Sequence, residues 1–303
     1  MNLTIRQMEI LAAAAEAATF SAAAGKLGIS QPALSESIRR IEHELGLTLF
    51  ERTTRSLKLT DDGRKCAAVA RELVQDFRRA LQRLSAGTNQ GHISIAALPS
   101  VACAAMPRAL AKFSRRHPGI GVSLHDVQHE RAIALLRDGL VDIAVTLKSA
   151  PADDLAFDGI AFDTAHLVCR RDHALARKKQ VRWRDLAGHP FVGITRISSV
   201  RRLTDAAFVH EDVAVEPRYE VEQVPSAIAL VEAGLGVTAL PSLTFAMFKG
   251  RDLAVRPLGE PVMRRHVGFV TRPQRQLPAF AIDLMRAIRA QVEHEIAATA
   301  AAR

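Results

Sequence analysis

The stretch Phe20–Gly46, FSAAAGKLGISQPALSESIRRIEHELG, decides how the N-terminal part of the chain folds. It predicts a short helix over 21–27, a turn at Gly28 and a longer helix. Glycine permits a sharp change of backbone direction, and serine hydroxyls satisfy free N–H groups at helix starts. We therefore expect Ser21 to cap the first helix and Ser30 to cap the second.

The second helix is amphipathic. Leu34, Ile38, Ile41 and Leu45 recur at spacings of four, three and four residues, so they share one buried face. The other face is polar and carries Gln31, Ser35, Glu36, Arg39, Arg40 and His43. A tight pair of helices with a polar second helix is typical of a helix-turn-helix that enters the DNA major groove. An ordinary helical hairpin with a solvated face is the alternative.

The residues that follow favour the DNA-binding interpretation. Residues 49–60, LFERTTRSLKLT, predict a strand, a turn and a strand, which is the small basic hairpin called a wing. The order of helix, helix-turn-helix and LFERTTRSLKLTDDG resembles the LysR family of bacterial transcriptional regulators. The stretch SQPALSESIRRIEHELGLTLFERT is the specific part of this resemblance, which extends more loosely over nearly the whole chain.

A helix docked in the groove would use its polar side chains in different ways. The amide of Gln31 can reach a base edge, Pro32 and Ala33 can contact a thymine methyl, and the arginines suit phosphates. Glu36 departs from the family, which often has a basic residue there; an acid repels phosphate but can accept from a cytosine amino group. The predicted DNA-binding set is Ser21, Ser30, Gln31, Pro32, Ala33, Ser35, Glu36, Arg39, Arg40, Arg52, Thr53 and Arg55.

Two more helices belong to this part of the chain. Residues 5–17 predict a first helix with Ile5, Met8, Leu11 and Ala15 facing the core. Residues 60–87 predict a long helix capped by Thr60, with a heptad seam for pairing with another helix. The seam consists of Cys66, Ala70, Leu73, Phe77, Ala80 and Leu84. In the resemblance this is the linker helix that pairs two subunits, and Ser85–Gly91 is a hinge.

From residue 91 onward, strands alternate with helices. We expect strands at 92–98, 121–127, 141–147, 166–170, 191–194, 213–222, 237–240 and 267–270. The helices are expected at 99–117, 130–139, 198–210, 225–233 and 277–297. This alternation predicts a largely parallel α/β sheet. Chains of this kind resemble type 2 periplasmic binding proteins, with two Rossmann-like lobes that the chain crosses twice.

The predicted organisation has three parts. Residues 1–60 form an all-α winged helix-turn-helix domain, 61–90 the dimerisation helix and hinge, and 91–303 an α/β effector domain. Lobe one covers 91–161 and 266–303, and lobe two covers 162–265. Ligands of such sheets bind at the carboxyl ends of strands, near helix N-termini. The predicted effector site is Pro99, Ser100, Val101, Thr146, Leu147, Thr195, Arg196, Ile197, Ser198, Gln223 and Val224.

Composition and motifs limit the other functions. The net charge is +9, but residues 1–90 hold 13 Lys and Arg against 10 Asp and Glu, so the excess is not concentrated in the DNA-binding part. Three widely spaced cysteines indicate reduced thiols. The sequence contains no nucleophile elbow, phosphate loop, dinucleotide fingerprint, metalloprotease pattern or Cys/His cluster for a metal. We expect neither a signal peptide nor a membrane span. The alternative function is that of a periplasmic-binding-like solute-binding protein or enzyme, for which residues 1–90 would be superfluous.

The resemblance implies a cytoplasmic regulator that is associated with the nucleoid when bound to DNA. Its partners would be double-stranded operator DNA, a small-molecule effector, RNA polymerase and further copies of the chain, in a dimer or tetramer. Arg196, Arg201 and Arg202 lie near one of the predicted cleft segments. Because helix N-termini and arginines favour anions, we expect the effector to be a carboxylate.

Overall fold

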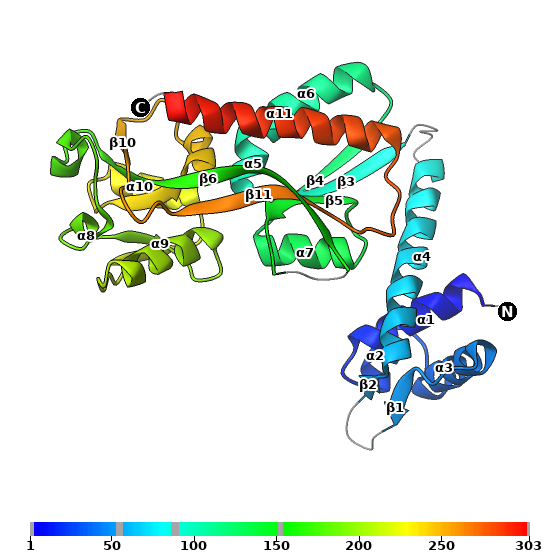
Figure 1. The fold of residues 1–303 in the computed structure, drawn as a ribbon. Helices are drawn as coiled ribbons and strands as arrows, with labels where there is room; N and C mark the ends of the chain where they lie inside the picture. The colour runs from blue at the N-terminus through cyan, green and yellow to red at the C-terminus, as the bar shows by residue number, and fades with distance from the viewer. Residues whose placement is uncertain (1–2, 53–56, 86–90, 151–153, 302–303) are drawn as a thin grey trace. The chain divides into compact units, whose positions relative to one another are not determined.

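A computed structural model describes residues 3–52, 57–85, 91–150 and 154–301. The chain divides into two compact units at the boundary between Gly91 and His92 (Figure 1). Within the described residues, no helix is long and apolar enough to span a membrane.

The first unit contains a three-helix core and a hairpin. Its elements are α1 (Ile5–Glu16), α2 (Phe20–Leu27), α3 (Gln31–Leu45), β1 (Phe50–Arg52), β2 (Leu57–Leu59) and α4 (Asp61–Ser85). Leu34, Ile38 and Ile41 of α3 are buried against α1, as their spacing predicts, and Leu45 packs at the edge of this core. Strands β1 and β2 pair antiparallel, which confirms the strand–turn–strand prediction; the turn at 53–56 lies outside the described residues.

The start of α3 confirms the predicted cap, whereas the start of α2 does not. The hydroxyl of Ser30 accepts from the Ala33 N–H at 3.4 Å, and Gly28 adopts the left-handed conformation with φ 64°. The predicted cap at Ser21 is wrong. Helix α2 begins one residue earlier, at Phe20, and the hydroxyl of Thr19 accepts from the Ala22 N–H at 3.2 Å. Ser21 therefore lies inside the first turn, where it is exposed.

The buried face of α1 is shifted from the predicted one. Met8 and Leu11 are buried as expected, but Ile10 and Ala14 complete the face. Ile5 and Ala15 are only half-buried. Helix α1 packs between α2, α3 and α4, so its apolar surface is wider than a single stripe.

Helix α4 begins as predicted, but its apolar residues form two stripes instead of one seam. The Thr60 hydroxyl accepts from the Gly63 N–H at 2.9 Å. Ala70 is fully buried in the core of its own unit, and Cys66 packs against the same core. Leu73 and Phe77 are 48% and 43% exposed, in line with Val69 and Leu81 at 56% and 48%. The side chains of Ala80 and Leu84 lie outside the described ones.

Lobe one of the second unit is a sheet covered on both faces. Helices α6 (Met106–Arg116) and α11 (Ala279–Ala301) cover one face, and α7 (His129–Arg137) covers the other (Figure 1). Strand β3 (His92–Ala97) pairs in parallel with β4 (Gly121–Asp126) and β5 (Ile143–Leu147). The short α5 (Pro99–Ala104) follows β3 and leads into α6.

Two long antiparallel strands connect the lobes. Strand β11 (Arg264–Thr271) pairs with β5 in lobe one and with β6 (Ala156–Arg170) along its whole length. Strand β6 then continues into lobe two, where it pairs with β9 and β10. The resulting seven-stranded sheet has the order β10-β6-β11-β5-β3-β4, with β9 also on β6. The expectation of a largely parallel sheet is wrong, because these crossing strands make the sheet mixed.

Lobe two packs around Trp183, Phe191 and Phe208. The rings of Trp183 and Phe208 lie edge to face with their centroids 5.6 Å apart, and the centroids of the Phe191 and Phe208 rings are 5.4 Å apart in the same arrangement. The elements of this lobe are η1 (Ala174–Arg177), α8 (Trp183–Leu186), β7 (Val192–Ile194), α9 (Ser199–His210), β8 (Tyr219–Val221), α10 (Val224–Glu232), β9 (Thr238–Pro241), η2 (Ser242–Met247) and β10 (Leu253–Pro257).

Several predicted elements need correction. The expected helix over 99–117 breaks at Ala105 into α5 and α6, because Pro107 lacks an N–H and its ring clashes with the preceding turn. The expected strand over 213–222 shrinks to β8, since Pro217 cannot donate to a ladder. Strand β6 begins at Ala156 and not at residue 166. Elements η1, α8, η2 and β10 were not predicted.

Candidate functional site

The start of α3 presents polar side chains that suit base contacts. Gln31 is exposed, and its Nε2 donates to the Ser35 hydroxyl at 2.9 Å. This bond holds the amide along the helix, with its oxygen available as an acceptor. Pro32 and Ala33 are exposed beside it, and the Ser30 hydroxyl is occupied in capping.

The two arginines further along α3 differ in their surroundings. Arg40 Nε donates to Glu36 Oε1 at 3.2 Å, in an ion pair between exposed side chains. Arg39 is exposed and forms no ion pair within the described part of the chain. Glu36 therefore restrains and partly neutralises Arg40, whereas no carboxylate of the described residues balances the charge of Arg39.

A carboxylate that the sequence did not single out attaches the wing to α3. Glu42 Oε1 accepts from the backbone N–H groups of Leu49 and Phe50 at 2.8 and 3.3 Å. Because β1 begins at Phe50, this contact fixes the start of the hairpin against the helix. The side chain of Arg52, together with Thr53 and Arg55, lies outside the described residues.

A small cavity lies between the two lobes of the second unit. Its volume is about 30 Å³, which is room for one or two water molecules. Of the predicted effector residues, it is lined by Pro99, Ser100, Ser198, Gln223 and Val224. These residues come from α5, from the N-terminal end of α9 and from the N-terminal end of α10. Polar residues that the sequence did not single out also line it, namely Gln128, Ser199, Glu222, Thr244 and Arg265.

The other predicted effector residues do not line this cavity. Val101 and Thr146 are completely buried, and the Thr146 hydroxyl hydrogen-bonds to His129 Nδ1 at 2.9 Å. Leu147 and Thr195 are half-buried outside the lining set, and Arg196 and Ile197 are exposed. Burial lowers the pKa of His129, which favours the neutral form of its ring.

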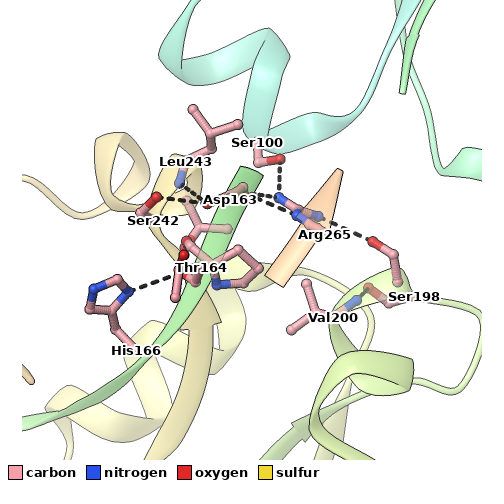
Figure 2. Close-up of polar contacts among 12 residues, drawn as sticks. Ser100, Asp163, Thr164, His166, Ser198, Val200, Ser242, Leu243 and Arg265 are labelled. Carbon is pink, nitrogen blue, oxygen red and sulfur yellow. Dashed lines mark hydrogen bonds and ion pairs between the residues drawn. The ribbon is translucent and has the colours of Figure 1, made fainter. Parts of the chain in front are cut away.

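Arg265 lines the cavity and forms hydrogen bonds with residues of both lobes (Figure 2). Its guanidinium bonds Asp163 Oδ2 through Nε at 3.0 Å and through Nη2 at 2.8 Å. Nη2 also donates to the Ser100 hydroxyl at 2.7 Å, and Nη1 donates to the Ser199 hydroxyl at 3.1 Å. Ser100 belongs to lobe one and Ser199 to lobe two. One arginine on a crossing strand therefore holds a hydroxyl of each lobe.

Asp163 completes this buried cluster. Its Oδ1 accepts from the Ser242 hydroxyl at 2.7 Å and from the Leu243 N–H at 3.1 Å. Asp163 is 0% exposed and Arg265 is 8% exposed. Opposite charges so deeply buried must be paired and hydrogen-bonded, and here both carboxylate oxygens are satisfied.

The arginines that the sequence suggested for gripping a carboxylate are engaged elsewhere. Arg201 is buried and binds Asp205 at 2.6 Å and Glu220 at 2.8 Å. Arg202 binds Glu130 at 2.7 Å, in an ion pair that links α9 of lobe two with α7 of lobe one. Arg196 is exposed outside the cavity. The cationic group in the cavity is instead Arg265.

The three cysteines are free thiols. Burial raises the pKa of Cys169 to about 11, and burial is also the largest cause of the raised pKa values of Cys66 and Cys103. A thiol with a raised pKa is protonated at neutral pH and is a weak nucleophile. Over the described ranges of the chain, no group of three or more His, Cys, Asp or Glu side chains can hold a metal ion.

Comparisons with known proteins agree with this architecture. Residues 5–64 match the family "Bacterial regulatory helix-turn-helix protein, lysR family", and residues 86–293 match "LysR substrate binding domain". The transcriptional regulator YbhD of Escherichia coli K12 is 31% identical over 90% of this chain and 86% of its own length. A full-length OxyR variant from Pseudomonas aeruginosa has a TM-score of 0.66, with 21% identity and 95% coverage of both chains.

The regulator CbnR, solved with its target DNA, has a TM-score of 0.55 and 23% identity, covering 95% of this chain and all of its own. The family matches span both units, and the solved relatives share the N-terminal helix-turn-helix and the two-lobed domain. These matches identify residues 5–64 as a DNA-binding helix-turn-helix of this family and residues 86–293 as its effector-binding domain. The chain belongs to the LysR family of bacterial transcriptional regulators.

Proposed function

We propose that the protein regulates transcription in response to a small organic anion that binds between the lobes of the effector domain. The observation that carries this proposal is the polar lining of the interlobe cavity around Arg265. In this proposal residues 1–60 bind the operator, 61–90 pair two subunits, and 91–303 bind the effector. Lobe one comprises 91–161 and 266–303, and lobe two comprises 162–265.

The DNA contacts are assigned to the exposed face of α3 and to the wing. The amide of Gln31, held by Ser35, binds a base edge in the major groove. Pro32 and Ala33 contact a thymine methyl, and Arg39 binds a phosphate. The proposal also includes Ser21, Ser30, Ser35, Glu36, Arg40, Arg52, Thr53 and Arg55.

Replacing Arg39 with alanine is expected to weaken binding to all DNA sequences by a similar factor and to flatten the salt dependence of binding. Gln31→Ala is expected to reduce discrimination at one or two base positions by about 1–3 kcal/mol. Arg40→Ala should cost less than Arg39→Ala, because Glu36 already partners Arg40. Gel-shift titrations over a range of salt concentrations measure all three effects. Unchanged operator binding in every variant would refute the docking of α3.

The anionic character of the effector follows from the donors around the cavity. Helices α9 and α10 both begin at its wall, and the first N–H groups of a helix attract negative charge. Ser100, Ser198 and Ser199 add hydroxyls, and Arg265 adds guanidinium N–H groups. Asp163 already balances the charge of Arg265, so we propose a small carboxylate and not a polyanion for this cavity.

A ligand larger than two water molecules needs the lobes to separate. Arg265 bridges Ser100 and Ser199, and Arg202 bridges to Glu130, so separation breaks hydrogen bonds on both sides of the cavity. A carboxylate can replace these lost partners with its own oxygens. Binding therefore exchanges contacts between the lobes for contacts with the ligand, which gives the effector a way to change their arrangement.

Ser100→Ala and Ser198→Ala are each expected to reduce the response to the effector while leaving effector-free operator binding intact. Ser100 loses its bond to Arg265, and Ser198 loses the cap that accepts from the Val200 N–H at 3.2 Å. Calorimetry with carboxylates compared against their amides measures affinity. Ser114→Ala, an exposed change on α6, is the control. Equal binding of acid and amide would refute the anion, and full affinity in both variants would place the site elsewhere.

The remaining parts of the proposal concern the assembly. We propose a homotetramer built from dimers that pair through α4, a cytoplasmic location on nucleoid DNA, contact with RNA polymerase, and no enzymatic activity or cofactor. The support comes from the exposed apolar stripe of α4 and from relatives that are transcriptional regulators.

A further inference from the structure

A second and larger cavity lies outside the interlobe cavity and shares a wall with it. The wall consists of α5 and η2, which pack against each other. Pro99 and Ser100 of α5 line the interlobe cavity, whereas Cys103 and Ala104 of the same helix line the second one. The second cavity, here called the basic groove, has a volume of about 1310 Å³ and is bounded further by β10, η1 and the C-terminal part of α11.

The lining of the basic groove is strongly cationic. Eight Lys and Arg residues line it against a single acid, Glu295. Four of the cations are paired: Arg108 with Glu295 at 3.4 Å, Arg171 with Asp252 at 2.9 Å, Lys178 with Asp185 at 3.0 Å and Arg251 with Glu232 at 2.5 Å.

The other four cations are Arg177, Lys179, Lys249 and Arg256, and none forms an ion pair within the described part of the chain. Arg256 is half-buried and fixed in place, because its Nε donates to the Ala176 carbonyl and its Nη1 to the Val255 carbonyl, both at 2.8 Å. Four uncompensated positive charges around one concave surface repel one another, and a multiply charged anion would relieve that repulsion.

Apolar side chains also line the groove. Phe245 and Phe248 lie there together with Leu253, and the buried ring of His166 contacts Phe245 edge to face at 5.3 Å. A lining that combines apolar and aromatic side chains with polar or charged groups is typical of a small-molecule site. The size of the groove suits an organic ligand and not a lone inorganic ion.

We propose that the basic groove is a second ligand site, which takes a small organic anion with two or more negative charges, either a phosphorylated or a polycarboxylic metabolite. It is separate from the interlobe cavity, where a single charged arginine is already balanced by Asp163. The free cations of the groove provide the charge, Arg256 provides a fixed orientation, and the phenylalanines cover the carbon skeleton of the ligand.

Calorimetry on the full-length protein tests this site. The probes are inorganic pyrophosphate and citrate, compared with acetate at equal ionic strength, so that phosphate and carboxylate chemistries are distinguished. We expect at least one of the two polyanions to bind at one site per chain. The triple variant Arg177→Gln, Lys179→Gln, Lys249→Gln should weaken that binding by about tenfold or more.

The control removes the same charge elsewhere. The control is the triple variant Lys112→Gln, Arg115→Gln, Arg131→Gln. These three side chains are exposed on α6 and α7, outside the groove. Their replacement should change the affinity for the polyanion by less than about twofold. Two results would overturn the proposal: polyanions that bind no better than acetate, or equal losses in both triple variants.

Thiol labelling locates the bound probe. Cys103 is exposed and lines the groove, whereas Cys66 is half-buried and Cys169 is buried. In a Cys66→Ser background a maleimide should therefore react at Cys103, and bound polyanion should slow that reaction. Ser100→Ala should keep the protection of Cys103, because Ser100 lines the interlobe cavity and not the basic groove. Evidence against ligand binding in the interlobe cavity would therefore not contradict the proposal for the basic groove. A groove triple variant that lowers operator affinity and its salt dependence without any probe would assign the groove to DNA and refute the proposal.

Discussion

Replacing Arg265 with leucine is expected to lower the free energy of unfolding of the effector domain by about 3–5 kcal/mol. The change leaves the carboxylate of Asp163 buried without its cation, and it removes the donors that Ser100 and Ser199 now accept from. Urea unfolding followed by the fluorescence of Trp183 measures the loss. Trp183 is the sole tryptophan and is fully buried in lobe two, so its signal reports on this domain alone.

A second variant separates the charge from the packing. Adding Asp163→Asn to Arg265→Leu should recover part of the stability, because an amide oxygen can still accept from Ser242 and Leu243 while no charge remains buried. Arg264→Leu is the matched control. Arg264, the neighbour of Arg265, is exposed, and its guanidinium carbon lies 4.6 Å from the centroid of the Phe162 ring. Replacing it should lower the free energy of unfolding by about 1 kcal/mol or less. Wild-type stability in Arg265→Leu would show that the buried pair contributes nothing to the fold.

Placing a charge on the exposed stripe of α4, as in Leu73→Glu or Phe77→Glu, is expected to lower operator affinity by about 10²–10⁴-fold. Both side chains are nearly half exposed within one subunit, so neither change disturbs its core. In a paired helix each glutamate would be buried without a partner. The dimer would dissociate, and the two recognition helices would no longer bind as a unit.

Light scattering and gel shifts test this prediction together. Ala68→Glu provides the control, since Ala68 is exposed and lies about 140° around the helix from Leu73. That variant should keep both its mass and its affinity. An unchanged oligomer in Leu73→Glu and Phe77→Glu would remove the stripe from the subunit interface.

The helix-turn-helix could be predicted from the sequence because its determinants are local. Gly28, Ser30 and the spacing of Leu34, Ile38 and Ile41 act within one or two turns of helix, and all behave as expected. The predicted cap at Ser21 was wrong for a local reason too: Thr19, two residues earlier, is also a capping residue and takes the position. Sequence pattern alone does not rank two neighbouring caps.

The crossing strands could not be predicted, because their determinants are far apart. The first half of β6 contains Asp158, Gly159 and Asp163, which are typical of loops, and Asp163 is stabilised by an arginine that lies 102 residues further along the chain. The sequence did hold one signal. Arg265 alternates with Val267 and Phe269, and the three share the buried side of β11. An arginine in that register indicates a buried partner.

The same two strands determine how the lobes can move. Strands β6 and β11 form a hydrogen-bonded ribbon, and a ribbon resists stretching and shear but is compliant in bending and twist. Its register shifts between Val267 and Gly268, and an irregularity of this kind disrupts the ladder locally and bends the strand. We therefore expect the interlobe cavity to open by a rotation about this point. Because Asp163 holds η2 to the ribbon through Ser242 and Leu243, we expect the same rotation to shift η2 and with it the wall of the basic groove.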